Sequence, residues 1–196
     1  MAGAFEGYRV VDFSTGLAGP FTSLRLADAG AEVIKVEPTG GDPIRHIGPR
    51  INGESAIFMA LNRNKKCLEL DEASATRDEV IDALVRSADV VIADHLSSHG
   101  RAIAYETLKA INPKLVYCSI SAYGEEGPLK NVEGSELSAQ AMSDYTNSLG
   151  TFGGTPVRVG TDIASMNTGI FGSQAIAAAL FHLARTGEGQ KVGVSL

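Results

Sequence analysis

Short apolar runs alternate along the chain with longer stretches in which hydrophobic residues recur every three or four positions. Strands are expected where the runs are richest in Val, Ile and other strand-forming residues, at residues 9–13, 32–36, 67–70, 90–93, 115–120 and 192–194. Helices are expected over residues 20–28, 76–86, 105–111 and 163–185. A loop is expected over residues 122–134, followed by a further helix that runs to about residue 147. A further long loop of Gly, Pro and polar residues is expected over residues 38–54.

Three residues indicate where helices begin and end. Pro20 suits the first turn of a helix, because its missing N–H would be unpaired there in any residue. Gly30 is predicted to close that helix in a left-handed conformation, and Gly187 to end the last helix. The stretch 163–185 is dense in Ala, Gly and Ser, which permits close packing, so we expect this helix to be central and buried.

The regular alternation of strand and helix predicts an α/β fold. The strands are apolar on both faces, which is typical of a parallel sheet covered by helices. A chain of 196 residues suits a single domain, so residues 1–196 are expected to form one unit. A sheet that stopped after residues 192–194 would leave an apolar edge exposed, which isolated proteins usually avoid. We therefore expect another chain, or another copy of this one, to complete the structure.

Composition narrows the class of partner. Hydrophobic residues make up 44% of the chain and the net charge is −6, so no basic surface is predicted for nucleic acid or for an anionic membrane. The N-terminus lacks the pattern of a signal peptide, and the apolar stretch 170–183 is too short to span a bilayer. Cys67 and Cys118 lie in strand-like runs and are expected to be buried free thiols, which indicates a reducing, cytoplasmic setting.

Several common site motifs are missing. The turn at residues 15–20 follows the first strand but does not match GxGxxG, and the sequence has no GxSxG, CxxC or P-loop motif. His95 and His99 are four residues apart in a Ser-rich loop where a helical face is not expected, so we interpret them as surface histidines. No metal site is predicted.

Six short segments of the chain resemble segments of a known enzyme family. They are VVDFSTGLAGP at 10–20, AGAEVIKVE at 29–37, Gly40–Asp42 with Arg45, LNRNK at 61–65, INP at 111–113 and TGEGQ at 186–190. In this order and spacing they resemble the N-terminal half of the CaiB/BaiF-type (class III) CoA transferases and the related α-methylacyl-CoA racemases. The resemblance implies a Rossmann-like fold, like the large domain of these enzymes. It also implies an interlocked dimer in which each active site uses both chains.

The resemblance further implies which positions contact coenzyme A. Carried over one by one, they are Thr15, Leu17, Ala18, Leu70, Asp94 and His95, with Arg101 as a stand-in for a phosphate-binding arginine. Pro38, Ala73 and Glu133 occupy positions where the family has cations, and each lost cation removes a charge-assisted contact to a phosphate. We therefore expect this chain alone to bind CoA or acyl-CoA weakly.

The catalytic positions implied by the resemblance also differ. The family's nucleophilic aspartate aligns with Ser165, and the racemase histidine aligns with Ser135. A serine is acylated only when a base activates it, and the neighbouring sequence offers Asp162 alone. Glu136 is a candidate base, or else a solvated or hydrogen-bonded carboxylate at the start of a helix.

Three functional hypotheses remain open at this point. The first is a subunit of a CoA transferase-family enzyme that acts on acyl-CoA esters and carboxylic acids, with the catalytic carboxylate supplied by a partner chain. The second is a non-catalytic structural or regulatory subunit that stabilises a related active chain. The third is an acyl-CoA racemase or lyase variant.

Overall fold

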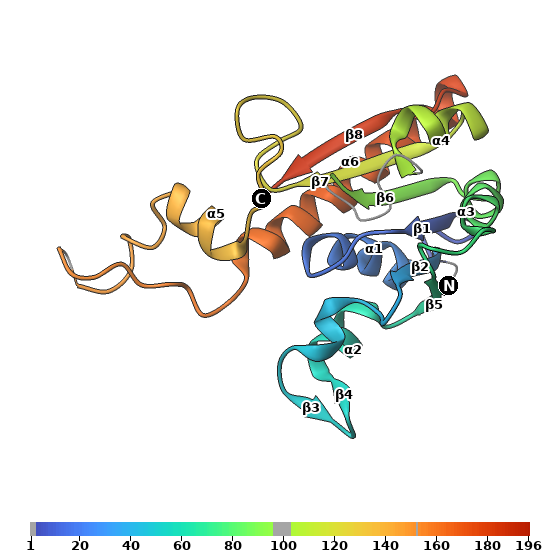
Figure 1. Ribbon diagram of the computed structural model, residues 1–196. Helices are drawn as coiled ribbons and strands as arrows, with labels where there is room; N and C mark the ends of the chain where they lie inside the picture. The colour runs from blue at the N-terminus through green and yellow to red at the C-terminus, as the bar shows by residue number, and fades with distance from the viewer. Residues whose placement is uncertain (1–2, 96–102, 152) are drawn as a thin grey trace.

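The protein is built on one six-stranded parallel sheet, seen in a computed structural model that describes residues 3–95, 103–151 and 153–196 (Figure 1). The sheet strands are β1 (Arg9–Asp12), β2 (Glu32–Pro38), β5 (Lys65–Leu70), β6 (Val90–Asp94), β7 (Val116–Ser121) and β8 (Lys191–Ser195). They lie in the order β5-β2-β1-β6-β7-β8, and every neighbouring pair is parallel. The predicted α/β fold with a Rossmann-like parallel sheet is confirmed.

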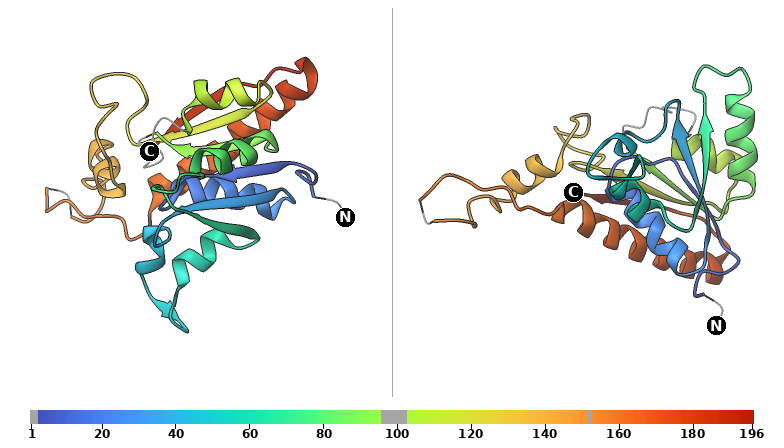
Figure 2. Two further views of the ribbon diagram at one scale, coloured as in Figure 1. Left: turned by 45° about the vertical axis from the view of Figure 1, so that its right-hand side comes forward. Right: turned by 90° about the horizontal axis from the view of Figure 1, so that it is seen from below.

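Helices cover both faces of the sheet (Figure 2). The helices that pack on it are α1 (Ala18–Asp28), α6 (Ile163–Thr186), α3 (Arg77–Arg86) and α4 (Tyr105–Ile111). One core cluster joins the sheet to α1 and α6, and the other joins it to α3 and α4. No helix in the described part of the chain is long and apolar enough to cross a bilayer.

Two glycines bring α6 unusually close to α1. A Cβ at Gly169 would lie 2.7 Å from the ring of Phe21, and one at Gly172 would lie 2.7 Å from the hydroxyl of Thr22. These two glycines thus permit the close contact between α6 and α1. The opposite face of α6 is open, with Phe171 61% exposed, so the expectation of a fully buried helix is wrong.

The structure departs from the predicted pattern in three further places. The predicted loop 38–54 contains a short 3₁₀ helix, η1 (Pro43–His46), and most of a two-stranded ribbon, β3 (Arg50–Ile51) and β4 (Glu54–Ser55). A helix that was not predicted, α2 (Ala56–Asn62), follows it. Helix α5 (Glu136–Met142) ends earlier than expected, because Asp144 adopts a left-handed φ of 59°. Cys118 is buried as predicted, whereas Cys67 is exposed because β5 is an edge strand with fewer neighbours.

The strand order creates a crevice at one edge of the sheet. The chain reverses its direction of travel across the sheet between β1 and β6, which lie side by side. In open parallel sheets, ligands bind beyond the carboxyl ends of the strands at such a reversal. The residues that follow β1 and β6 are therefore the ones that the fold places at a site.

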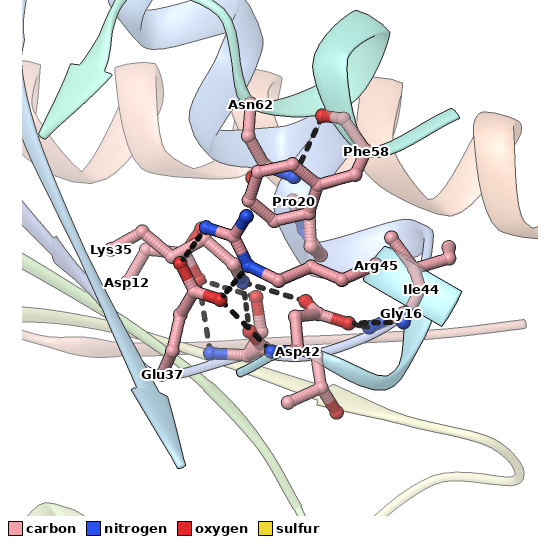
Figure 3. A network of polar contacts seen from close by, with 12 residues as sticks. Asp12, Gly16, Pro20, Lys35, Glu37, Asp42, Ile44, Arg45, Phe58 and Asn62 are labelled. Carbon is pink, nitrogen blue, oxygen red and sulfur yellow. Dashed lines mark hydrogen bonds and ion pairs between the residues drawn. The ribbon is translucent and has the colours of Figure 1, made fainter. Parts of the chain in front are cut away.

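Buried ion pairs hold this edge of the sheet together (Figure 3). Lys35 on β2 pairs with Asp42 at 2.9 Å, and Lys65 on β5 lies 3.6 Å from Asp12 at the end of β1, with all four side chains fully buried. Burial alone would lower the pKa of Lys35, but the charges of Asp12 and Asp42 outweigh it and raise the pKa. Lys35 also donates to the carbonyl oxygen of Ser14 at 2.7 Å.

A second, half-buried part of the network fixes the η1 segment. Glu37 accepts hydrogen bonds from Arg45 Nε at 2.6 Å and from the backbone N–H of Asp42 at 2.9 Å. The Arg45 guanidinium lies 3.6 Å from the centre of the Phe58 ring. Asp42 in turn accepts from the N–H groups of Ile44 and, at 3.3 Å, of Gly16. The turn after β1 and the η1 segment are thus tied to the same buried charges.

We predict that Lys35→Met lowers the free energy of unfolding by about 3–5 kcal/mol, because it leaves buried carboxylates without their partner. Lys66→Met is the matched control on β5: Lys66 is 73% exposed and pairs with Glu32 at 2.6 Å. An exposed pair of this kind contributes about 0–1 kcal/mol. Urea denaturation of both variants at pH 7 measures the difference, and equal losses would contradict the role given to the buried network.

Candidate functional site

A cavity of about 640 Å³ lies at the carboxyl edge of the sheet, at the crevice between β1 and β6. Its walls come from the turn that connects β1 to α1, the η1 segment, the ends of β6 and β7, and the first residues of α5 and α6. These segments are far apart in the sequence, and the parallel sheet brings them together. The cavity therefore occupies the place where this fold class binds ligands.

Most of the residues singled out from the sequence meet in this cavity. Its lining includes Thr15, Leu17, Ala18, Asp94, His95, Glu136 and Ser165. Leu70 is not among the lining residues; it is 5% exposed and packs in the core cluster beneath α3. Arg101 lies outside the described residues.

Asp94 spans the crevice from the end of β6 to the turn after β1. Its Oδ2 accepts a hydrogen bond from the backbone N–H of Thr15 at 2.7 Å and from the Thr15 hydroxyl at 3.1 Å. Burial raises the pKa of Asp94, the Thr15 N–H opposes this effect, and the charge of Asp12 adds to it, so that the pKa reaches about 6. Asp94 thus combines a structural contact with an unusual affinity for a proton.

Glu136 performs a similar role at the start of α6. Its Oε1 accepts from the N–H of Ala164 at 2.9 Å and from Gln140 at 2.7 Å. Its Oε2 accepts from the N–H of Ser165 at 2.9 Å and from the Ser165 hydroxyl at 2.8 Å. The first turn of a helix has N–H groups without partners inside the helix, and here a carboxylate from another helix pairs with two of them.

This contact corrects the expectation that Ser165 has only Asp162 as a nearby carboxylate. Asp162 is engaged in an ion pair with Arg158 at 2.5 Å, whereas Glu136 contacts the Ser165 hydroxyl directly. Glu136 and Ser165 are 29 positions apart, so sequence proximity could not reveal the pair.

The surroundings of Glu136 make it a poor base. Burial alone would raise its pKa, but the hydrogen bonds from Gln140, Ser165 and Ala164 outweigh burial and lower the pKa below its ordinary value. A carboxylate that binds a proton this weakly gains little by taking one from a serine. The pair is arranged to hold the helix start and to orient the Ser165 hydroxyl.

The described lining of the cavity carries more negative than positive charge. Its carboxylates are Asp94, Glu133 and Glu136, and its basic side chains are Lys130 and His95. No group of three or more His, Cys, Asp or Glu residues in the described ranges is placed to hold a metal ion.

A second, more polar pocket of about 430 Å³ shares Asp94 and His95 with the cavity. In it Glu125 pairs with Lys191 at 2.6 Å and lies 3.5 Å from His95 Nδ1. Burial alone would raise the pKa of Glu125, but Lys191 and Ser119 outweigh it and lower the pKa. Glu125 and Lys191 were not predicted as site residues, because each is an ordinary charged residue and they are far apart in the sequence. Lys191 lies beside Tyr117 at the start of β8, and the loop after β7 brings Glu125 to it.

Comparisons with known proteins agree with the architecture. Residues 5–196 match CoA-transferase family III. The chain is 40% identical to a succinate–glutarate CoA-transferase from Agrobacterium fabrum, over 97% of this chain and 50% of that protein. It is 38% identical to a succinyl-CoA:glutarate CoA-transferase from Mus musculus, over 97% of this chain and 45% of that protein.

The fold is also that of a solved relative. The crystal structure of a CaiB/BaiF family protein from Brucella suis superposes with a TM-score of 0.93 at 36% identity, over 100% of this chain and 53% of that one. This chain spans about half the length of the curated relatives it matches.

We predict that Asp94→Asn stabilises the protein at neutral pH. Because the pKa of Asp94 is raised to about 6, the folded state binds its proton more tightly than the unfolded chain does. This contribution to stability is present below about pH 4 and is lost as the pH rises through about 6. Asparagine stays neutral and can still accept from Thr15. The gain should be about 1–2 kcal/mol at pH 7.5, after allowance for solvent in the cavity, and near zero at pH 4.

Chemical denaturation at pH 7.5, 6 and 4 measures the effect. Asp78→Asn, which removes an exposed carboxylate on α3, is the control and should show no such pH dependence. A loss of stability in Asp94→Asn at pH 7.5 would contradict the assignment of a destabilised, ionised Asp94.

Proposed function

Because the chain belongs to CoA-transferase family III, we propose that it is a subunit of an enzyme that acts on acyl-CoA esters and carboxylic acids. The observation that carries this proposal is the cavity at the carboxyl edge of the sheet, which gathers Thr15, Leu17, Ala18, Asp94 and His95 around one space. These are the positions that the family resemblance associates with coenzyme A. The two relatives described above are named for transfer of CoA between succinate and glutarate.

We propose that the catalytic carboxylate of the assembled enzyme comes from a partner chain. Ser165 occupies the position that the resemblance assigns to the nucleophilic aspartate, and its hydroxyl lines the cavity. Acylation of Ser165 would form an ester and release the CoA thiolate, and the hydroxyl proton would have to pass to a base. The only carboxylate that touches this hydroxyl in the described structure is that of Glu136, whose pKa is lowered. Ser165 is therefore proposed not to become acylated.

Exposed apolar side chains support the proposal of a partner. Helix α5 and the described chain that leads from it to α6 project away from the sheet (Figures 1 and 2). On this projection Met142 is 63% exposed and Val157 is 46% exposed, and on the open face of α6 Phe171 and Phe181 are 61% and 64% exposed. A partner that covered these side chains would gain the free energy of removing them from water. The partner is either a complementary chain of the same family or a second copy of this one.

One observation favours the second hypothesis, that of a non-catalytic subunit. All the polar atoms of the Glu136 carboxylate are engaged in holding α6, and the Ser165 hydroxyl is held with them. A racemase or lyase variant gains no comparable support, since Ser135 caps α5 through a reciprocal contact with Ser138. Measurement of acyl transfer separates a catalytic from a structural role.

We predict that the wild-type chain forms no acyl adduct on Ser165. The protein is incubated with succinyl-CoA and, separately, with butyryl-CoA, treated or not with hydroxylamine, and analysed by peptide mass spectrometry. Ser165→Asp introduces a carboxylate, whose ionised form attacks without losing a proton, so this variant should acquire a hydroxylamine-sensitive adduct. Ser165→Asn, of equal size and without a carboxylate, is the matched control and should remain unmodified.

An adduct on Ser165 of the wild-type chain would overturn the proposal that a partner supplies the nucleophile. The absence of an adduct in Ser165→Asp, in a variant that still folds and binds succinyl-CoA, would favour the non-catalytic hypothesis instead.

We also predict that the chain is not a stable monomer, because an apolar face such as that of α6 is stabilised by association. Native mass spectrometry and light scattering should show self-association of the wild-type chain, and Phe171→Ser with Phe181→Ser should reduce it. Arg86→Ser on α3, where the side chain is 66% exposed, is the control. A monodisperse monomer of 20.5 kDa, with all its CoA-ester binding intact, would count against the prediction.

A further inference from the structure

We infer that the cavity accepts an uncharged, hydrocarbon acyl group and discriminates against an acyl group that ends in a second carboxylate. The inference rests on the proposed function, because it names the class of acyl-CoA ester that the same cavity takes. Three features of the cavity carry it: the occupation of its backbone N–H groups, its charges and its apolar wall.

Backbone donors in the turn after β1 and at the start of α6, two places that would attract an anion, are already occupied by the protein's own carboxylates. Asp94 accepts from the N–H of Thr15 at 2.7 Å, and Asp42 accepts from that of Gly16 at 3.3 Å. Glu136 accepts from the first N–H groups of α6 at 2.9 Å. The starts of helices and the turns after strands normally form anion sites in this fold class. These four donors are filled from within the chain, so an incoming carboxylate that used them would have to displace a carboxylate that is already bound. The start of α1, which also lines the cavity, has no such side-chain cap.

The charges of the described lining oppose an anion as well. Asp94, Glu133 and Glu136 face the cavity, and among its described lining residues Lys130 is the single lysine. His95 lies 3.5 Å from Glu125 and lines the second pocket as well. A further carboxylate among these groups would meet like charges, and repulsion of this kind disfavours its burial.

The rest of the lining suits a hydrocarbon chain. The apolar side chains of Leu17, Ile44, Ile120, Val132 and Leu196 line the same space. Hydrocarbon gains free energy when it leaves water for such a surface, and a terminal carboxylate would lose its hydration there. The apolar surface and the carboxylates already bound to backbone N–H groups therefore both favour an acyl group without a charge.

The test compares two esters whose acyl groups have four carbons and differ at the far end. Butyryl-CoA ends in a methyl group and succinyl-CoA in a carboxylate, while the CoA portion is the same. Dissociation constants are measured at pH 7.5 by NMR titration of the methyl resonances of the full chain, with free CoA as the reference. We expect butyryl-CoA to bind at least tenfold more tightly than succinyl-CoA and more tightly than free CoA.

A charge variant ties the preference to the cavity. Glu133→Gln should lower the ratio of the succinyl-CoA dissociation constant to the butyryl-CoA dissociation constant at least twofold, because it removes one negative charge from the lining. Glu79→Gln makes the same change in net charge on the exposed side of α3, away from the cavity, and should leave the ratio unchanged. Equal narrowing in both variants would show a general charge effect and overturn the assignment to the cavity.

Binding of the two esters and of free CoA distinguishes a wrong acyl preference from a wrong proposed function. If succinyl-CoA binds as tightly as butyryl-CoA or more tightly, the acyl preference is wrong, while binding of a CoA ester still supports the proposed function. If butyryl-CoA binds no better than free CoA, the cavity does not recognise the acyl group and the inference falls alone. If neither ester nor CoA binds at millimolar concentration, both are overturned.

Discussion

Two buried lysines hold together the parts of the structure that form the cavity: Lys35, beside the end of β1, and Lys65, at the first position of β5. Lys35 and Lys65 extend from β2 and β5 into a region without solvent, where Asp12 and Asp42 neutralise them. A buried charge is tolerated only when it is paired and hydrogen-bonded, so the positions of these four groups constrain one another. Since Asp42 also binds the N–H of Gly16, the constraint extends from the sheet to the turn that lines the cavity.

The same requirement explains why the cavity is lined by carboxylates that are not free to react. A turn after a strand and the first turn of a helix both leave N–H groups without partners in regular structure. Asp94 pairs with such a group at Thr15, and Glu136 does so at Ala164 and Ser165. The carboxylates are therefore part of the backbone's hydrogen bonding. Their charge is a by-product of that role, and it determines what else the cavity can hold.

Sequence patterns predicted the sheet and its main helices because these elements follow local periodicity. The helix predicted over residues 163–185 is observed as Ile163–Thr186, with Gly187 in the left-handed conformation that ends it. Local patterns failed where a single backbone conformation decides, as at Asp144, or where position in the sheet decides, as for the exposed Cys67.

The candidate site was predictable as a set of positions but not as a set of contacts. The family resemblance located Thr15, Asp94 and Ser165, which do meet around one cavity. The pairing of Glu136 with Ser165 depends on how α5 lies across the start of α6, and no spacing in the sequence encodes that. Tertiary packing therefore supplied the part of the site that bears most directly on its chemistry.

The close approach of α6 to α1 has a mechanical consequence for the cavity. Gly169 and Gly172 lie so near Phe21 and Thr22 that neither helix can slide or rotate against the other without a clash. Both helices begin at the cavity, so their first turns together form one rigid wall. The facing wall comes from η1 and from the chain that leads into α5, and it meets this helix pair through side chains: Ile44 packs with Phe21, and Glu136 binds the first N–H groups of α6. Adjustment to the size of a bound molecule must therefore come from movement of such side chains and not from a shift of one helix against the other.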